Sequence, residues 1–278
     1  MVASGASAAD ALAAAADSFA AAGIETPRLD AEVLLSELSG IDRAALIADR
    51  DLTLEPAAAR AFSEAVRRRI RREPVAYILG SKGFRHIELT VDRRVLVPRP
   101  ETEMLVELAL EVQPESVLEI GTGSGAIALA VADELPGCRI TASDVSDGAI
   151  EVAAANANRL GLCERVEFLV GSLPVGAAGF DLILANLPYV PDSDGLPPEV
   201  GQWEPPEALF GGPDGTDVIA SVLAGMGGAG VTAPVIGLEI GQGQGERVAA
   251  MLRAVGWSET EVRPDLAGIE RLMVGRTS

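Results

Sequence analysis

The stretch LEIGTGSGAIALA, residues 118–130, decides the fold of this chain. It opens as an apolar run typical of a buried strand and closes as an apolar helix, with Gly121, Gly123 and Gly125 between them. Glycine lacks a Cβ, so the backbone there can turn tightly and approach a ligand closely. Asp144 ends the next predicted strand, where a carboxylate can accept hydrogen bonds from both hydroxyls of a ribose. Together these features predict a nucleoside-binding turn in a Rossmann-like domain.

A parallel sheet is predicted around this turn, because short apolar segments alternate with helical ones from Ser116 onward. Strands are expected at residues 116–120, 138–143, 166–170, 180–185 and 234–240, with helices at 126–135 and 147–160. The tail, residues 259–266 and 270–276, is expected to add an antiparallel pair at one edge. The predicted fold class is therefore α/β, with a Rossmann-like domain over residues 101–278.

Residues 1–73 are predicted to form a small N-terminal helical bundle. Prolines near first turns, closing glycines and a basic last turn indicate helices at residues 8–23, 27–40 and 55–72. Residues 74–100 are expected to connect the two domains through a β-hairpin formed by residues 84–91 and 94–98. The segment PRPETE should then open a helix that continues to residue 112.

The charge of the chain limits its functions. The chain holds 22 Lys and Arg against 41 Asp and Glu, so the formal net charge is −19. This charge is expected to repel nucleic acid at long range, and no direct contact with nucleic acid is expected. Residues 67–99 are an exception, with ten basic and three acidic side chains. We interpret them either as a solvated helix end followed by a basic hairpin, or as a docking surface for an acidic partner.

Cysteine and histidine usage narrows the setting and the chemistry. Cys138 and Cys163 have no metal-ligand spacing, so no metal site is predicted, and a reduced cytoplasmic location is favoured. His86 is the single histidine, which excludes mechanisms that need two, and we interpret it as structural. The N-terminus lacks the basic patch of a signal peptide, and no apolar stretch approaches the ~20 residues that cross a bilayer. We expect a cytoplasmic monomer without membrane contact.

The glycine loop also indicates which nucleoside is bound. It has the pattern G-x-G-x-G rather than G-x-G-x-x-G, and Glu119 stands two residues before its first glycine. This pattern resembles the first motif of S-adenosylmethionine-dependent methyltransferases, in which the acid ahead of the loop orients the amino group of the ligand. NAD remains the alternative cofactor.

A second stretch, ILANLPYVP at residues 183–191, predicts the chemistry. It is an apolar strand that ends on Asn186, and the ligand of an open α/β sheet lies beyond the carboxyl ends of its strands. Pro188 pushes Leu187 into an extended conformation. The Asn186 side-chain oxygen and the Leu187 carbonyl oxygen can then converge on one substrate NH₂ group. Tyr189 is expected to supply a flat wall for a planar carrier, either a carboxamide or an exocyclic base amine.

The chain resembles the HemK/PrmC family, the peptide chain release factor N5-glutamine methyltransferases, over nearly its whole length. The segments that carry the resemblance, in the family's order, are EPVAYILG, VPRPETE, LEIGTGSGAIALA, SDVS, ANLPY, EPPEALFGGPDG and LEIGQGQG. The resemblance implies a Rossmann-like methyltransferase domain, an N-terminal bundle that recognises the release factor, and S-adenosylmethionine as cofactor. Its implied substrate is the glutamine of the GGQ loop in class 1 release factors.

The resemblance also implies roles for individual residues. The implied cofactor-binding residues are Glu119, Gly121, Thr122, Gly123, Gly125, Asp144, Ser172 and Asn186. The implied catalytic and substrate-binding residues are Asn186, Leu187, Pro188 and Tyr189, with Arg99 and Glu101 at the rim of the site. Two departures stand out: the family's N-P-P-Y is N-L-P-Y here, and its Gly-Asp after the third strand is Gly171-Ser172.

Two other hypotheses stay open at this point. N-L-P-Y also occurs in methyltransferases that act on rRNA adenines, so the alternative function is adenine-N6 methylation of nucleic acid. The other is a non-enzymatic partner of the translation machinery, which would transfer no methyl group to any amide.

Overall fold

The computed structural model describes residues 7–49, 52–174 and 179–278. Contacts divide the chain into two compact units. The smaller unit contains Met1–Ser81 and Leu196–Trp203, and the larger contains Lys82–Gly195 and Glu204–Ser278. The smaller unit therefore runs past residue 73 and includes a short segment from far along the chain.

The smaller unit is helical. Its helices are α1 (Ala8–Ala21), α2 (Pro27–Ser39), α3 (Arg43–Ala48), α4 (Pro56–Ile70), α5 (Val75–Leu79) and, from the later segment, α9 (Pro198–Gly201). The Ser7 hydroxyl caps α1 by accepting a hydrogen bond from the Asp10 amide at 3.1 Å. Gly40 ends α2 with a φ of +70°. Large side chains fill the core, including Leu12, Phe19, Leu34, Leu35 and Phe62.

A buried arginine joins α4 to two other parts of the helical unit. Arg69 donates from Nε to Asp30 Oδ2 of α2 at 2.8 Å and from Nη2 to Glu199 Oε1 of α9 at 3.1 Å. Arg72 pairs with the second oxygen of Glu199. The Arg69 side chain is 6% exposed, so the two carboxylates neutralise a charge that would otherwise be costly to bury. These ion pairs explain why residues 196–203 belong to the helical unit.

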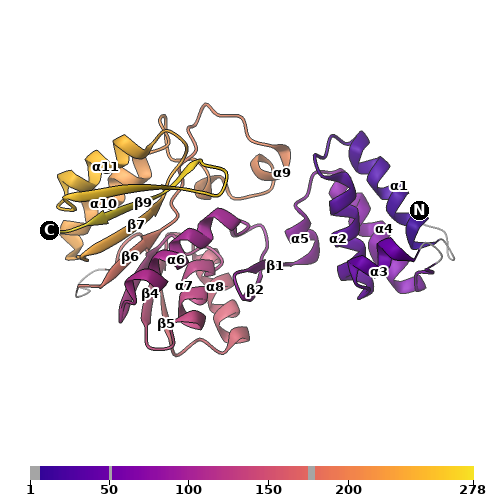
Figure 1. Cartoon of the computed structure of the whole chain (residues 1–278), viewed down its shortest axis with the longest axis horizontal. Coiled ribbons are helices and arrows are strands. Elements are labelled where there is room, and N and C mark those ends of the chain that lie inside the picture. The colour runs from indigo at the N-terminus through magenta and orange to yellow at the C-terminus, as the bar shows by residue number, and fades with distance from the viewer. Residues whose placement is uncertain (1–6, 50–51, 175–178) are drawn as a thin grey trace. The chain divides into compact units, whose positions relative to one another are not determined.

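The larger unit is built on a seven-stranded sheet in the order β5-β4-β3-β6-β7-β9-β8 (Figure 1). The strands are β3 (Ser116–Ile120), β4 (Arg139–Asp144), β5 (Val166–Val170), β6 (Leu182–Ala185), β7 (Val235–Glu239), β8 (Glu259–Pro264) and β9 (Glu270–Arg276). Strands β3 to β7 are parallel, and β9 pairs antiparallel with both β7 and β8. This arrangement confirms the α/β class and the antiparallel pair expected at the edge.

The strand order creates a switch point beside β3. The chain moves to one side of β3 for β4 and β5, and to the other side for β6 and β7. At such a point the loops leaving β3 and β6 diverge and open a crevice beyond the carboxyl ends of the strands. The glycine loop follows β3 and the NLPY segment follows β6, so both motifs lie at this crevice.

Helices cover both faces of the sheet (Figure 1). They are α6 (Glu103–Val112), α7 (Ala126–Glu134), α8 (Asp147–Leu160), α10 (Asp217–Ala229) and α11 (Gly245–Ala254). One core joins strand residues such as Leu118 and Ile183 to Leu223 of α10 and Leu252 of α11. On the other face α6 packs so closely that a Cβ on Gly237 would meet Leu108 Cδ2 at 2.5 Å. Among the described residues, no helix is both long enough and apolar enough to cross a membrane.

The hairpin is not formed by the expected segments. It pairs β1 (Ser81–Phe84) with β2 (Ile87–Thr90), and residues 91–99 are not a strand, so the prediction for 94–98 was wrong. The chain reverses at Arg85, which has a φ of +51°. Arg85 is held there by Glu103, which accepts from its backbone amide at 3.1 Å, and by Glu134, which accepts from its guanidinium. These contacts come from α6 and α7, so local turn residues do not reveal them.

Most basic side chains of the segment 67–99 are paired with carboxylates of the same chain. At least seven of its ten basic side chains form ion pairs with carboxylates of described residues: Arg67, Arg68, Arg69, Arg72, Arg85, Arg94 and Arg99. Several of these pairs are shielded from water, such as Arg85 with Glu134 at 2.7 Å. The segment therefore serves mainly to hold elements of the fold together.

Candidate active site

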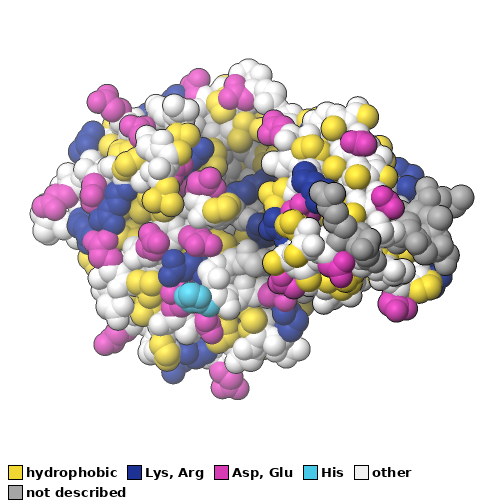
Figure 2. Space-filling model, turned by 45° about the vertical axis from the view of Figure 1, so that its right-hand side comes forward, with side chains coloured by type: hydrophobic (Ala, Val, Ile, Leu, Met, Phe, Trp, Pro, Cys, Tyr) yellow, Lys and Arg dark blue, Asp and Glu magenta, His cyan; other side chains and the backbone are white. Residues whose placement is uncertain are grey.

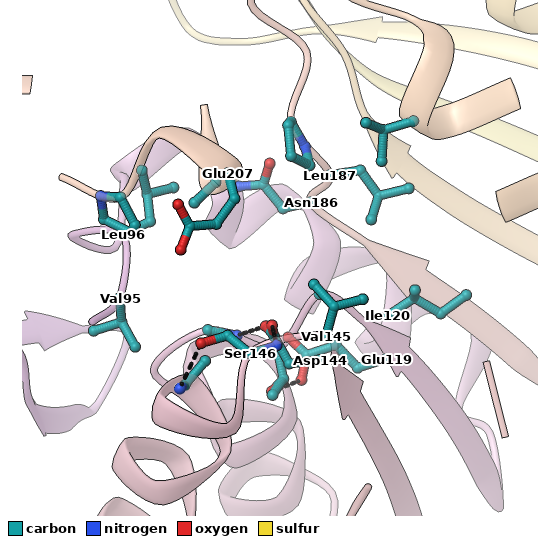
Figure 3. A pocket seen from close by; sticks show the side chains of 18 of the residues that line it. Val95, Leu96, Glu119, Ile120, Asp144, Val145, Ser146, Asn186, Leu187 and Glu207 are labelled. Atoms are coloured by element: carbon teal, nitrogen blue, oxygen red, sulfur yellow. Dashed lines mark hydrogen bonds between the residues drawn. The ribbon is translucent and has the colours of Figure 1, made fainter. Parts of the chain in front are cut away.

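A cavity of about 510 Å³ lies at the carboxyl ends of β3, β4 and β6. This volume is typical of a site for a small-molecule ligand. Figure 3 shows Asp144, Val145 and Ser146 on one side of the cavity and Asn186, Leu187 and Glu207 on the other. Ten of the predicted site residues line it: Arg99, Glu119, Gly121, Thr122, Gly123, Asp144, Ser172, Asn186, Leu187 and Pro188.

The glycine loop turns as the sequence predicts. The backbone φ values of Gly121, Gly123 and Gly125 are +77°, +55° and +83°. Residues other than glycine adopt such values only with steric strain. The loop is fixed to β4, because the amides of Gly121 and Thr122 both donate to the Ser143 carbonyl oxygen, at 2.8 and 3.0 Å. Gly125 does not line the cavity. A Cβ there would meet Leu129 Cδ1 at 2.9 Å, so its role is close packing of α7.

Glu119 is a buried carboxylate with one oxygen unused. Its Oε2 accepts from the Thr122 hydroxyl at 2.6 Å and from the Ala128 amide at 3.1 Å. Its Oε1 is buried and has no partner among the described residues. Burial raises the pKa of Glu119 to about 8, and the hydrogen bonds from Thr122 and Ala128 act against that rise. A cationic or NH-bearing ligand group would supply the missing partner of Oε1.

Asp144 is oriented by the backbone on both sides of it. Its Oδ2 accepts from the Gly123 amide and its Oδ1 from the Ser146 amide, each at 2.9 Å. Carboxylate oxygens have further lone pairs, so each can also accept from a ribose hydroxyl. Val145, 68% exposed, and the exposed Ser172 line the same end of the cavity. They offer apolar surface and a hydroxyl to a nucleobase.

Asn186 is the first residue after β6, and its side-chain NH₂ group is already hydrogen-bonded. Its Nδ2 donates to Thr102 Oγ1 at 3.0 Å, and among the described residues neither its Oδ1 nor the Leu187 carbonyl oxygen accepts a hydrogen bond. Both residues line the cavity. Two adjacent residues of the cavity wall therefore each keep an oxygen acceptor without a hydrogen bond, which suits a ligand that brings two N–H hydrogens.

The backbone of the NLPY segment packs closely against two glycines and accepts a hydrogen bond from one glutamine. A Cβ on Gly211 would collide with the Pro188 carbonyl oxygen, and a Cβ on Gly215 would collide with that of Tyr189. Gln244 donates from Nε2 to the Tyr189 carbonyl oxygen at 2.9 Å. The FGGPDG and GQGQG segments thus fit closely against the motif. This contact gives a physical reason for glycine at 211 and 215.

Two of the predicted site residues do not line the cavity, and a third lines it while it is paired with a buried carboxylate. Tyr189 does not line the cavity, and its hydroxyl donates instead to Glu239 Oε1 at 3.1 Å. Glu101 is half-buried beside the cavity without lining it. Arg99 does line it, and its guanidinium pairs with the buried Glu204 at 2.6 Å. Glu204 also accepts from the Val97 amide at 3.0 Å, which links the EPPEALFGG segment to VPRPETE.

Sequence reasoning missed several residues of this site. Thr102 and Glu207 line the cavity, as do Val95 and Leu96 from the segment after the hairpin. In Figure 3 the Glu207 carboxylate points into the cavity from the opposite side to Asp144. Glu239 is reached through Thr102 and Tyr189 and was also missed. Glu239 could have been found from its position at the end of β7, because β7 lies next to β6 in the sheet and parallel strands end at the same edge.

Known proteins resemble this chain over both of its units. The model of the PrmC N-terminal domain matches residues 10–80, and a methyltransferase domain model matches residues 117–197. Among solved structures, the hMettl16 catalytic domain in complex with the MAT2A 3′UTR hairpin 6 shares the fold. It has a TM-score of 0.54 at 12% identity, covering 68% of this chain and 76% of that chain.

Curated relatives extend along most of the chain. The release factor glutamine methyltransferase of Rhodospirillum rubrum is 40% identical over 92% of this chain and 80% of its own length. The protein of the same name from Moorella thermoacetica is 41% identical over 91% of this chain and 92% of its own length. On this evidence the chain belongs to the release factor glutamine methyltransferase family.

Proposed function

We propose that this protein methylates the side-chain nitrogen (N5) of the glutamine in the GGQ loop of class 1 release factors, with S-adenosylmethionine as methyl donor. The observation that carries the proposal is the Asn186 amide, whose nitrogen is engaged by Thr102 and whose oxygen stays available beside the Leu187 carbonyl. A glutamine NH₂ offers the two hydrogens that this pair of acceptors can bind. The family to which the chain belongs supports the same reaction.

The residues present fit S-adenosylmethionine. When bound, this cofactor supplies an electrophilic methyl group on a sulfonium. Glu119 would accept from its amino group through the buried Oε1 that lacks a partner. Asp144 would accept from the ribose hydroxyls, and Ser172 with Val145 would meet the adenine. Gly121 and Gly123 would let the backbone approach, since both have left-handed φ values.

The protein's main contribution to the reaction is orientation. A carboxamide nitrogen is a poor nucleophile, because its lone pair is delocalised into the carbonyl. Asn186 Oδ1 and the Leu187 carbonyl oxygen would hold both N–H groups, so that the π face of the nitrogen meets the methyl group. Fixing the reactants in this geometry lowers the activation barrier by several kcal/mol. The barrier lowering in well-oriented intramolecular reactions reaches ~7–11 kcal/mol.

The same two oxygens stabilise the charge that develops. Transfer of a methyl group from the cofactor's sulfonium would place positive charge on the substrate nitrogen. Acceptors already aimed at its hydrogens stabilise that charge without having to reorganise. The methylated nitrogen would then lose one proton to water.

The charge distribution favours a protein over a nucleic acid as substrate. An adenine flipped out of a helix could present its NH₂ to the same acceptors. However, the net charge is −19, and Figure 2 shows Asp and Glu side chains spread among the Lys and Arg side chains of the visible face. Most arginines of the basic segment are also paired, as Arg85 is with Glu134. We propose that the helical unit recognises the release factor and that the enzyme acts as a cytoplasmic monomer.

The test uses the purified full-length protein with methyl-labelled S-adenosylmethionine. Its substrates are a class 1 release factor with an intact GGQ loop, the same factor with GGA, and a single-stranded adenine-rich oligonucleotide. We expect label on the GGQ factor alone. Label on both release factors, on neither, or on the oligonucleotide would contradict the substrate assignment.

A further inference from the structure

The hydrogen bonds of Asn186 continue into two buried residues. Asn186 Nδ2 donates to Thr102 Oγ1 at 3.0 Å, and Thr102 Oγ1 donates to Glu239 Oε2 at 2.6 Å. Thr102 is 4% exposed and Glu239 is 3% exposed. Thr102 ends the short helix η1 (Pro100–Thr102), and Glu239 is the last residue of β7. Three segments far apart in the sequence thus meet behind the NLPY motif.

The direction of these hydrogen bonds follows from the chemistry of the groups. An ionised carboxylate can only accept, and a threonine hydroxyl carries a single proton. Thr102 therefore gives its proton to Glu239 and can offer Asn186 only a lone pair. Only the NH₂ end of the Asn186 amide can face that lone pair. The oxygen of the amide is consequently left for the substrate.

Other groups help to keep Glu239 an acceptor. Tyr189 donates its hydroxyl to the second oxygen, Oε1, at 3.1 Å. The pKa of Glu239 is raised, chiefly by burial, and the hydrogen bonds from Thr102 and Tyr189 and the positive charge of Arg271 oppose that rise. Both carboxylate oxygens are thus satisfied by hydroxyl donors, which is the pattern that suits the ionised form.

We propose that Thr102 and Glu239 are positioning residues that determine which end of the Asn186 amide meets the substrate. This inference rests on the proposed glutamine methylation and goes beyond it, because it names what makes the site selective for an NH₂ group. In the reversed arrangement Thr102 would donate to Asn186 Oδ1, and the Asn186 NH₂ would face the NH₂ of the substrate. Two donors that face each other leave hydrogen bonds unmade in a desolvated site.

The main test is Glu239→Gln, measured in the full-length protein with the GGQ release factor. Glutamine keeps nearly the same shape, but its amide can donate as well as accept. The Thr102 hydroxyl could then accept from that amide and donate its proton to the Asn186 oxygen. We expect kcat to fall at least about tenfold. The Kd for S-adenosylmethionine and the Tm are expected to stay close to those of the wild type. Thr102→Val should lose activity in the same way, and Thr102→Ser, which keeps the hydroxyl, should lose much less.

A second measurement isolates the orientation of the amide. In Asn186→Asp the side chain has two equivalent oxygens, so it presents an acceptor whichever way it is turned. Adding Glu239→Gln to Asn186→Asp should therefore cause little further loss of single-turnover rate. In the wild-type background the same change should cost at least about tenfold. Equal losses in both backgrounds would contradict a role through Asn186.

The outcomes separate this inference from the function on which it rests. A wild-type protein that leaves the GGQ factor unlabelled contradicts the proposed function. An active wild type combined with an unchanged kcat in Glu239→Gln contradicts only the positioning role. A Glu239→Gln protein that loses Tm and cofactor affinity in step with kcat also contradicts it, because Glu239 would then be merely structural.

Discussion

Glu119 holds the Thr122 hydroxyl with one carboxylate oxygen, at 2.6 Å, while its other oxygen is buried without a partner among the described residues. The carboxylate is therefore half satisfied when no ligand is bound. A group in this condition prefers to be protonated, and burial raises the pKa of Glu119 to about 8 from an ordinary 4.5. Both the cofactor site and the stability of the ligand-free protein depend on this residue.

The stability of the ligand-free protein should fall as the pH rises. Between pH 4.5 and about 8 the folded protein keeps the Glu119 proton that the unfolded chain has lost. The stabilisation is thus complete below pH 4.5 and is lost as the pH passes through about 8. Glu119→Gln, which does not titrate, should reduce the slope of the unfolding free energy by up to about 1.4 kcal/mol per pH unit. Urea unfolding from pH 5.5 to 8.5 measures this difference, and parallel curves would contradict it.

Asp144 should control cofactor affinity. Asp144→Ala removes the proposed acceptor of the ribose hydroxyls and should weaken binding of S-adenosylmethionine at least about tenfold, as expected for lost hydrogen bonds to a charged group. Asp147→Ala is the matched control, because Asp147 is exposed at the start of α8, three residues further along the chain, and does not line the cavity. Calorimetry gives both dissociation constants. Similar losses in the two variants would show that the loop, not the Asp144 carboxylate, matters.

Asn186→Ala should separate methyl transfer from cofactor binding. The truncation removes one of the two acceptors for the substrate amide, so transfer should fall below detection while the Kd for S-adenosylmethionine changes little. Asn158→Ala, an equivalent truncation at an exposed position of α8, should keep wild-type activity. The measurements are label transfer to the GGQ factor and calorimetric binding of the cofactor. If cofactor binding disappears together with transfer, the role assigned to Asn186 is incorrect.

Two substitutions of Tyr189 distinguish its ring from its hydroxyl. The hydroxyl donates to Glu239, so Tyr189→Phe should lower kcat about 2- to 10-fold, the effect of one hydrogen bond. Tyr189→Ala also removes the ring and should lower kcat further. Steady-state kinetics with the GGQ factor compares the two. If Tyr189→Phe is fully active, the ring alone contributes, as the interpretation of Tyr189 as a flat wall requires.

Arg69 should be a main determinant of stability in the helical unit. Arg69→Ala leaves Asp30 without its cation and Glu199 with Arg72 alone, and breaking such a buried pair costs about 3–5 kcal/mol. Arg67→Ala, two residues away, breaks an exposed pair with Glu64 and should change stability little. Urea unfolding of the two full-length variants measures the contrast. Equal effects would mean that the buried cluster contributes no more than a surface ion pair.

Much of the fold could be predicted from local patterns. The strands at 116–120 and 166–170, the helix at 147–160 and the antiparallel pair at the edge follow from apolar periodicity and from helix start and stop signals. The hairpin could not be placed in this way, because its turn at Arg85 has a positive φ without a glycine. Contacts from Glu103 and Glu134 hold that turn, and they lie outside any local window.

The sequence by itself determined the edge of the sheet at which the site lies. Parallel strands end at one edge, so Gly121, Asp144 and Asn186 had to converge there once each was placed at the end of its strand. Only the tertiary structure decided how Asn186 is turned and which residues hold it. Thr102, Asn186 and Glu239 meet through hydrogen bonds of 2.6 and 3.0 Å between distant segments. Contacts of this kind depend on how helices and strands pack, and no local pattern in the chain records them.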